Sequence, residues 1–126
     1  MFKLLLFKNI PYKNSFLDLF PDSDRYDIEK TVEIDVTELD KIIDYKYQPH
    51  FMKLDIQGAE LKALKGLGKY IDNIDYIYTE VNTEKVYKDC ALMSEIDEFL
   101  KEKGFERKCE AIYKQYGWGD AFYMRV

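Results

Sequence analysis

Cysteine and long apolar runs are scarce in this sequence, and each shortage excludes a class of protein. The two cysteines, Cys90 and Cys109, are too few for a disulfide framework and lack the close pairing of a zinc site. We interpret them as small buried or half-buried thiols in a reducing compartment, and therefore expect a cytoplasmic protein. The apolar run from Leu4 to Phe7 is too short to span a bilayer, and no small-residue cleavage site follows it. It is predicted to be a strand rather than a signal peptide or a membrane anchor.

Basic charge and metal-ligand spacing are also missing. The formal net charge is -5 at pH 7, so the chain has no general attraction for phosphate backbones, and we expect no nucleic-acid partner. No set of His, Cys and Asp residues has the spacing of a metal site. A metal between Asp55 and Glu80 is conceivable, but nothing in the sequence supports one, so no metal is expected.

Apolar and aromatic residues, in contrast, are plentiful. The chain has 126 residues, of which 47% are hydrophobic and 16% are aromatic. A chain of this length and composition can bury a hydrophobic core without disulfides or metal ions to support it, so residues 1–126 are predicted to form a single domain.

Strand and helix patterns alternate along most of the chain. Such alternation is typical of an α/β fold with a parallel sheet and right-handed crossovers. The short connection through Gly117-Trp118-Gly119 makes the last two strands an antiparallel pair. Strands are predicted at Phe2 to Ile10, Thr31 to Val36, Phe51 to Asp55, Ile74 to Val81, Phe105 to Tyr113 and Gly119 to Val126, and helices from Thr37, from Ala59 to Tyr70 and from Met93 to Lys103.

Two helix ends carry recognisable signals. Thr37 and Asp40 have the spacing of a capping box, which predicts the start of a short helix. Gly104 follows the helix that begins at Met93, at the position where a left-handed cap belongs.

One segment carries a specific resemblance. The run from Phe51 to Leu61, FMKLDIQGAEL, resembles the signature of the FkbM methyltransferases, a family that uses S-adenosylmethionine (SAM). Thr31 to Asp40 is similar to the strand and helix start before that signature, and Ile77 to Val81 is similar to the strand after it. Gly119 to Arg125 resembles the last strand of the family. The resemblance implies a partial Rossmann-like methyltransferase sheet, whose parallel strands are closed by an antiparallel C-terminal hairpin.

The chain departs from the family in one respect. Family members open with a strand, a glycine-bearing turn and a helix that hold SAM, and residues 1–126 contain no such segment. The two Gly-x-Gly patterns, Gly66-Leu67-Gly68 and Gly117-Trp118-Gly119, do not follow a strand and open a helix, so neither qualifies. We expect the chain to match the C-terminal half of the domain, and to bind SAM weakly or not at all by itself.

The resemblance also suggests site residues. Asp55 and Glu80 end neighbouring parallel strands, where the ligand crevice of an open sheet lies. As catalytic residues, they would orient an acceptor hydroxyl or accept its proton. Gln57, Gly58 and Glu60 shape the turn that follows the first of these strands, and are the candidate cofactor-binding residues.

Each candidate also has a structural interpretation. Asp55 could cap the following helix near Gly58, and Glu60 could simply favour the helix dipole. The single histidine, His50, lies at the end of its strand opposite to the crevice, so a surface role is expected. Trp118 either packs over its loop or contacts a partner.

Two functions therefore compete. The first, which the resemblance implies, is a SAM-dependent O-methyltransferase that acts on a hydroxyl of a sugar or secondary metabolite. The second is a non-catalytic remnant or half-domain that binds a partner chain. A companion chain that supplies the glycine loop is a further possibility.

The family sheet also predicts strand neighbours. The parallel part should include Thr31 to Val36 or Phe2 to Phe7 at one side, followed by Phe51 to Asp55 and Ile74 to Val81. Gly119 to Val126 should lie antiparallel beside Ile74 to Val81, with Phe105 to Tyr113 outside it. The strand from Phe51 to Asp55 lacks its family neighbour, the glycine-loop strand. We expect either that Phe2 to Phe7 fills the vacant edge or that two copies of the chain pair there.

Overall fold

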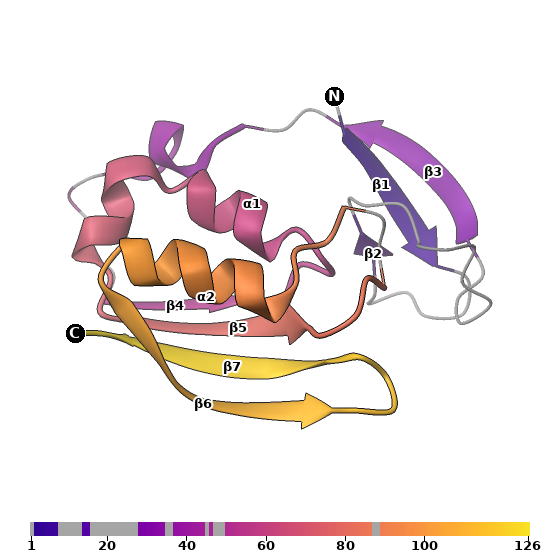
Figure 1. Cartoon of the computed structure of the whole chain (residues 1–126). Coiled ribbons are helices and arrows are strands. Elements are labelled where there is room, and N and C mark those ends of the chain that lie inside the picture. Colours follow the sequence, from indigo (N-terminus) through magenta and orange to yellow (C-terminus); the bar gives the residue numbers. More distant parts are fainter. Residues whose placement is uncertain are drawn as a thin grey trace.

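The structure is a computed structural model, whose strands form two separate sheets of three and four strands (Figure 1). The four-stranded sheet and its helices form an α/β unit, as the sequence predicts. The residues that the structure describes are 2–7, 14–15, 28–34, 37–44, 46, 50–86 and 89–126.

The smaller sheet contains the N-terminal strands. Strand β1 (Phe2–Phe7) lies between β2 (Asn14–Ser15) and β3 (Ile28–Ile34), and both pairings are antiparallel. The expectation that Phe2 to Phe7 or Thr31 to Val36 joins the parallel strands is therefore wrong. An antiparallel pair needs no helical crossover, so strands that are close in sequence can pair with each other directly. Asp35 and Val36 lie outside the described residues.

The larger sheet has the strand order that the family predicts. Strands β4 (Phe51–Leu54) and β5 (Tyr76–Asn82) are parallel. Strand β7 (Trp118–Arg125) lies antiparallel beside β5, and β6 (Phe105–Tyr113) lies outside β7. The order β4-β5-β7-β6 confirms the predicted position of the closing hairpin.

The helix predicted from Ala59 to Tyr70 is broken in two. The α-helix α1 spans Glu60–Lys65, and the 3-10 helix η2 spans Gly68–Asn73. Gly68 has a φ of +54°, and a Cβ atom added there would lie 2.6 Å from a carboxylate oxygen of Asp40. A tertiary contact that only glycine permits thus ends the helix early.

The other helix predictions have mixed outcomes. The α-helix α2 spans Met93–Glu102, and Gly104 adopts the predicted left-handed conformation, with a φ of +86°. The helix expected from Thr37 is only a short 3-10 helix, η1 (Leu39–Lys41). Its N-cap is Glu38, which makes no side-chain capping bond, so the predicted capping box is wrong.

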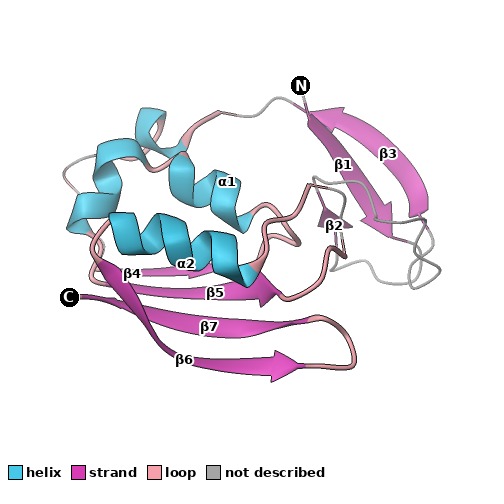
Figure 2. Cartoon of the chain, viewed as in Figure 1, coloured by secondary structure: helices cyan, strands magenta, loops and turns pink. Residues whose placement is uncertain are grey.

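The helices α1, η2 and α2 lie on one side of the four-stranded sheet (Figure 2). Along β5, Ile77, Thr79 and Val81 face these helices and are fully buried. Tyr76 and Tyr78 alternate with them and face away, and Tyr76 is 39% exposed. The core therefore occupies one face of the sheet, and side chains on the outer face remain in contact with solvent.

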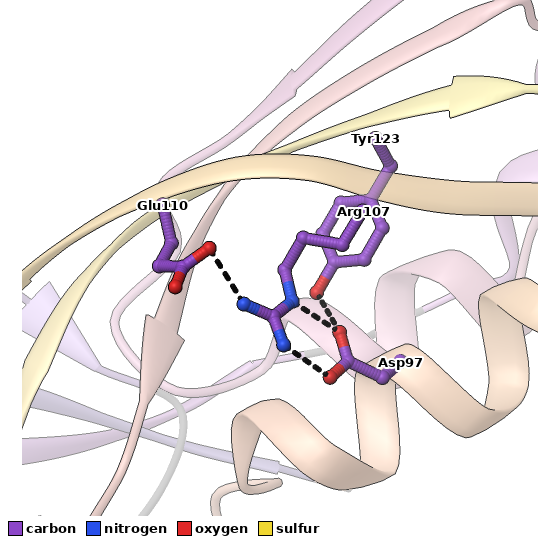
Figure 3. A network of polar contacts seen from close by, with 4 residues as sticks. All are labelled: Asp97, Arg107, Glu110 and Tyr123. Atoms are coloured by element: carbon purple, nitrogen blue, oxygen red, sulfur yellow. Dashed lines mark hydrogen bonds and ion pairs between the residues drawn. The ribbon is translucent and has the colours of Figure 1, made fainter.

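A polar network joins α2 to the closing hairpin (Figure 3). Arg107 donates from Nε and Nη2 to the two carboxylate oxygens of Asp97, at 2.9 and 3.1 Å. The buried hydroxyl of Tyr123 donates to the same carboxylate at 2.8 Å. Burial and the bond to Asp97 raise the pKa of Tyr123, so its phenol stays protonated.

A β-bulge completes this network. Lys108 is left out of the β6–β7 register, which passes from Arg107 directly to Cys109. Because of this extra residue, Glu110 reaches the same face as Arg107, and their side chains form an ion pair at 2.7 Å.

A second cation lies close to this network, at the open end of the hairpin where Phe105 pairs with Arg125. The Arg125 guanidinium donates to the backbone carbonyls of Ile71, Ile74 and Lys103, and it stacks over the Phe105 ring at 4.3 Å. One side chain therefore satisfies carbonyls from η2, from its C-cap and from the C-cap of α2.

The network in Figure 3 makes a graded prediction about stability. Tyr123→Phe removes one neutral donor and should lower the free energy of unfolding by about 1 kcal/mol. Asp97→Asn weakens a charged bidentate pair as well, and should cost about 2–3 kcal/mol. Urea unfolding checks both values, with the exposed neighbour Glu98→Gln as the unchanged control. Equal losses in the two variants would contradict this account.

Candidate active site

The turn that follows β4 has an unusual backbone. Gln57 and Gly58 have consecutive positive φ angles of +55° and +105°. A left-handed conformation is costly for a residue with a side chain, so the surroundings must hold Gln57 in place. Such strain is common at ligand sites.

Glu60, the first residue of α1, supplies that constraint. Its side chain is 1% exposed, and its two carboxylate oxygens accept hydrogen bonds from the N–H groups of Ile56 and Gly58, each at 3.0 Å. Burial raises the pKa of Glu60, and the bonds from the backbone amides oppose that rise. The carboxylate is thus engaged by the turn itself, and the helix-dipole interpretation alone does not explain its position.

Asp55 lies exposed at the start of the turn. Its carboxylate accepts a hydrogen bond from the side-chain amide of Gln57 at 2.8 Å. The N-cap of α1 is Ala59, and the N–H of Gly58 is satisfied by Glu60 rather than by Asp55. The helix-capping interpretation of Asp55 is therefore not what the structure shows.

Glu80 lies within β5 rather than at its end. The strand continues to Asn82 because β7 pairs with it as far as Trp118. The parallel register pairs Leu54 with Thr79, so the next residues, Asp55 and Glu80, lie at the same level along the two neighbouring strands. The structure thus brings the two predicted catalytic residues to the same level, at the C-terminal end of β4.

Asp120 is a third carboxylate at this level, and the sequence analysis did not select it. It lies directly opposite Glu80 in the β5–β7 pair. The charge of Asp120, together with a side-chain hydrogen bond to it, raises the pKa of the neighbouring Tyr78. The signal that could have found Asp120 was the predicted antiparallel pairing of its strand with the strand that contains Glu80.

The sequence analysis also assigned roles to a histidine and a tryptophan. His50 is at the opposite end of β4, where its Nδ1 lies 2.8 Å from the Asp75 carboxylate, on the surface as expected. Trp118 packs against Tyr113 and Tyr116, at ring-centre distances of 5.0 and 6.4 Å. This packing agrees with the interpretation that the tryptophan covers its own loop.

A groove of about 690 Å³ lies between η1, α1 and the helix side of β4, which is an edge strand of the sheet in the described part of the chain. Its lining is mainly apolar and includes Leu39 of η1, Met52 and Leu54 of β4, Ile56 of the turn, and Ala59 and Ala63 of α1. Asp55, Glu80 and Asp120 do not line this groove, so the groove and the three carboxylates are separate features.

Two kinds of feature are absent from the described residues. No group of three or more His, Cys, Asp or Glu side chains there is arranged to hold a metal ion. None of the helices in the described part of the chain combines the length and apolar character needed to cross a membrane.

The Glu60 side chain generates a prediction with a pH dependence. Glu60→Ala leaves two amides of the turn without an acceptor, and should lower the free energy of unfolding by about 2–4 kcal/mol. Glu60→Gln keeps one acceptor without burying a charge, and should lose less.

The pKa of Glu60 is raised in the folded chain, so protonation of this group favours folding. The stabilisation from protonated Glu60 is fully present below the pKa of this group in the unfolded chain, at about 4.3. It is lost as the pH rises through the raised pKa of Glu60 in the folded chain. Urea unfolding over this range should show wild type losing stability relative to Glu60→Gln as the pH increases. A difference that is constant, or that changes in the other direction, would contradict the assignment.

No curated protein and no solved structure matches the chain. A family model described as "Methyltransferase FkbM domain" matches residues 8–107, which include β4, the Glu60 turn, β5 and α2. The match covers most of the sequence, and the chain belongs to the FkbM methyltransferase domain family.

Proposed function

We propose that this chain is the acceptor-side part of a SAM-dependent O-methyltransferase, and that its four-stranded sheet is the closing half of a Rossmann-like sheet. The proposed acceptor is a hydroxyl of a sugar or secondary metabolite. The observation that carries the proposal is the position of Asp55 and Glu80, at the same level of two parallel strands in an FkbM domain.

The two carboxylates have the chemistry that methyl transfer to oxygen needs. An acceptor hydroxyl must be aligned for attack and must lose its proton. Asp55 is exposed, and Glu80 is partly exposed beside Asp120, so either carboxylate is accessible to a hydroxyl. We assign orientation of the hydroxyl and acceptance of its proton to this pair.

The described residues do not fit a complete SAM site. SAM supplies the methyl group in such enzymes. The turn after β4 resembles a cofactor turn because it follows a strand and opens a helix, but Glu60 already occupies the N–H groups of Ile56 and Gly58. Gln57 and Gly58 thus remain candidates for contact at the rim of the cofactor site, while Glu60 would act by holding the turn.

The non-catalytic alternative has one supporting observation. In the described part of the chain, β4 pairs with β5 alone, and an apolar groove lies on its helix side. An edge of this kind suits a partner chain, including a companion that supplies the glycine loop. A half-domain that binds such a partner would use the same structure without transferring a methyl group itself.

The cofactor prediction follows from the missing glycine turn. Each lost charge-assisted hydrogen bond costs about 1.5–3 kcal/mol, so two or three losses weaken binding roughly a thousandfold or more. Calorimetric titration of the purified chain with SAM and with S-adenosylhomocysteine should show no saturable binding at micromolar concentrations. Micromolar affinity for either compound would contradict the proposed incomplete site.

The catalytic assignment is tested by methyl transfer. Radiolabelled SAM at millimolar concentration is incubated with the chain and a panel of sugars and hydroxylated metabolites. Asp55→Asn and Glu80→Gln should each reduce transfer about 100-fold or more, whereas Asp72→Asn, an exposed change in η2, should not. Full transfer by both variants would overturn the assignment, and no transfer to any acceptor would favour the non-catalytic alternative.

A further inference from the structure

The free edge of β4 presents hydrogen-bonding groups at alternate residues. The carbonyl of His50 accepts the N–H of Tyr76 at 2.9 Å, so His50 faces β5. The N–H and C=O of one residue point to the same side of a strand, and this side alternates from residue to residue. Met52 therefore also faces β5, whereas Phe51 and Lys53 direct their backbone groups away from it.

No strand among the described residues receives these groups. Strand β1 pairs with β2 and β3, so the expectation that Phe2 to Phe7 fills the vacancy is wrong. Phe51 is 55% exposed, which leaves a large ring at the edge in contact with water. An accessible edge with apolar side chains is a template for another strand.

We propose that β4 pairs antiparallel with β4 of a second copy of this chain, around a two-fold axis at Met52. In this register, Phe51 of each copy forms a hydrogen-bonded pair with Lys53 of the other, and the two Met52 residues face each other. All four backbone groups of Phe51 and Lys53 at each edge gain a partner.

The faces of the sheet restrict the register. A two-fold axis perpendicular to the joined sheet keeps the two outer faces on the same side, so paired residues must share a face. Phe51 and Lys53 lie on the outer face, because their partners in β5 are Tyr76 and Tyr78, while Met52 is opposite the buried Ile77 on the helix side. Registers that pair odd with even positions are thereby excluded.

Strand length and charge select between the remaining registers. An axis at Phe51 would place Lys53 opposite residue 49, which precedes β4, so only Phe51 would form a hydrogen-bonded pair within the strand. An axis at Lys53 would place two lysines directly opposite each other, which is unfavourable. An axis at Met52 instead places each Lys53 beside the Phe51 ring of the other copy, where a cation–π contact is favourable. The Met52 side chains line the apolar grooves, so the same axis also joins the two grooves across the dimer.

The edge fits a second copy because it is complementary to itself in this register. The backbone groups of Phe51 in one copy meet those of Lys53 in the other, each Lys53 lies beside a Phe51 ring, and the two apolar grooves adjoin. The dimer leaves Glu80 and Asp120 accessible, because they lie on strands away from the joined edge.

The first test is the mass of the native chain in solution, measured by size-exclusion chromatography with light scattering. We expect twice the chain mass of 15.1 kDa. Lys53→Pro removes the outward N–H but leaves the bonds from β4 to β5, so it should fold with an unchanged circular dichroism spectrum and weaken the dimer about tenfold or more. Lys53→Gln keeps the N–H and is the matched control. A monomeric native chain, or a Lys53→Pro protein that dimerises as tightly as wild type, would overturn the proposal.

The second test fixes the register. In a Cys109→Ser background, which leaves only the buried Cys90, Met52→Cys should oxidise to a disulfide-linked dimer. The Cα atoms of such a facing pair lie about 4.5 Å apart, which is within disulfide range. Lys53→Cys should cross-link at least about tenfold more slowly, since its Cα atoms face Phe51 rather than each other. Faster linkage through position 53, or none through position 52, would refute an axis at Met52.

Discussion

The hydrogen bonds between the Glu60 carboxylate and the turn after β4 are the constraint on which the proposed site depends. This turn must place Asp55 at the strand end, pass through two left-handed residues and start α1 within a few positions. Without an acceptor, the unpaired amides of Ile56 and Gly58 would lower the free energy of unfolding by about 2–4 kcal/mol, a large part of the roughly 5–15 kcal/mol that stabilises a domain. The buried Glu60 side chain thus holds the turn in one conformation, and this conformation sets the position of Asp55.

The position of Glu80 depends on a different set of contacts. Asp97, Arg107 and Tyr123 join α2 to the closing hairpin, and Arg125 joins the open end of the same hairpin to η2 and the end of α2. These bonds hold β7 beside β5, in the register that places Asp120 opposite Glu80. The polar contacts lie on the helix side of the sheet, whereas Glu80 and Asp120 alternate with the buried Thr79 and Ala121 and lie on the outer face.

The sequence could predict the four-stranded sheet because its strands have clear patterns and because the family resemblance supplied their order. It could not predict the pairing of β1 with β3, since alternation shows that a segment is a strand but not which strand is its neighbour. The break between α1 and η2 depends on the contact between Gly68 and Asp40, which are distant in sequence. Asp55 and Glu80 were found from strand ends, whereas Asp120 depends on a register that only the folded sheet defines.

The most direct measurement of the central claim is native-state amide hydrogen exchange at the turn after β4. The account predicts that the N–H groups of Ile56 and Gly58 exchange slowly in the folded chain, because the buried Glu60 carboxylate accepts both. In Glu60→Ala they should exchange rapidly, while the amide of Ile77 in the core of β5 stays protected at low denaturant. Rapid exchange of Ile56 and Gly58 in the wild-type chain would show that Glu60 does not hold the turn, and would contradict the account.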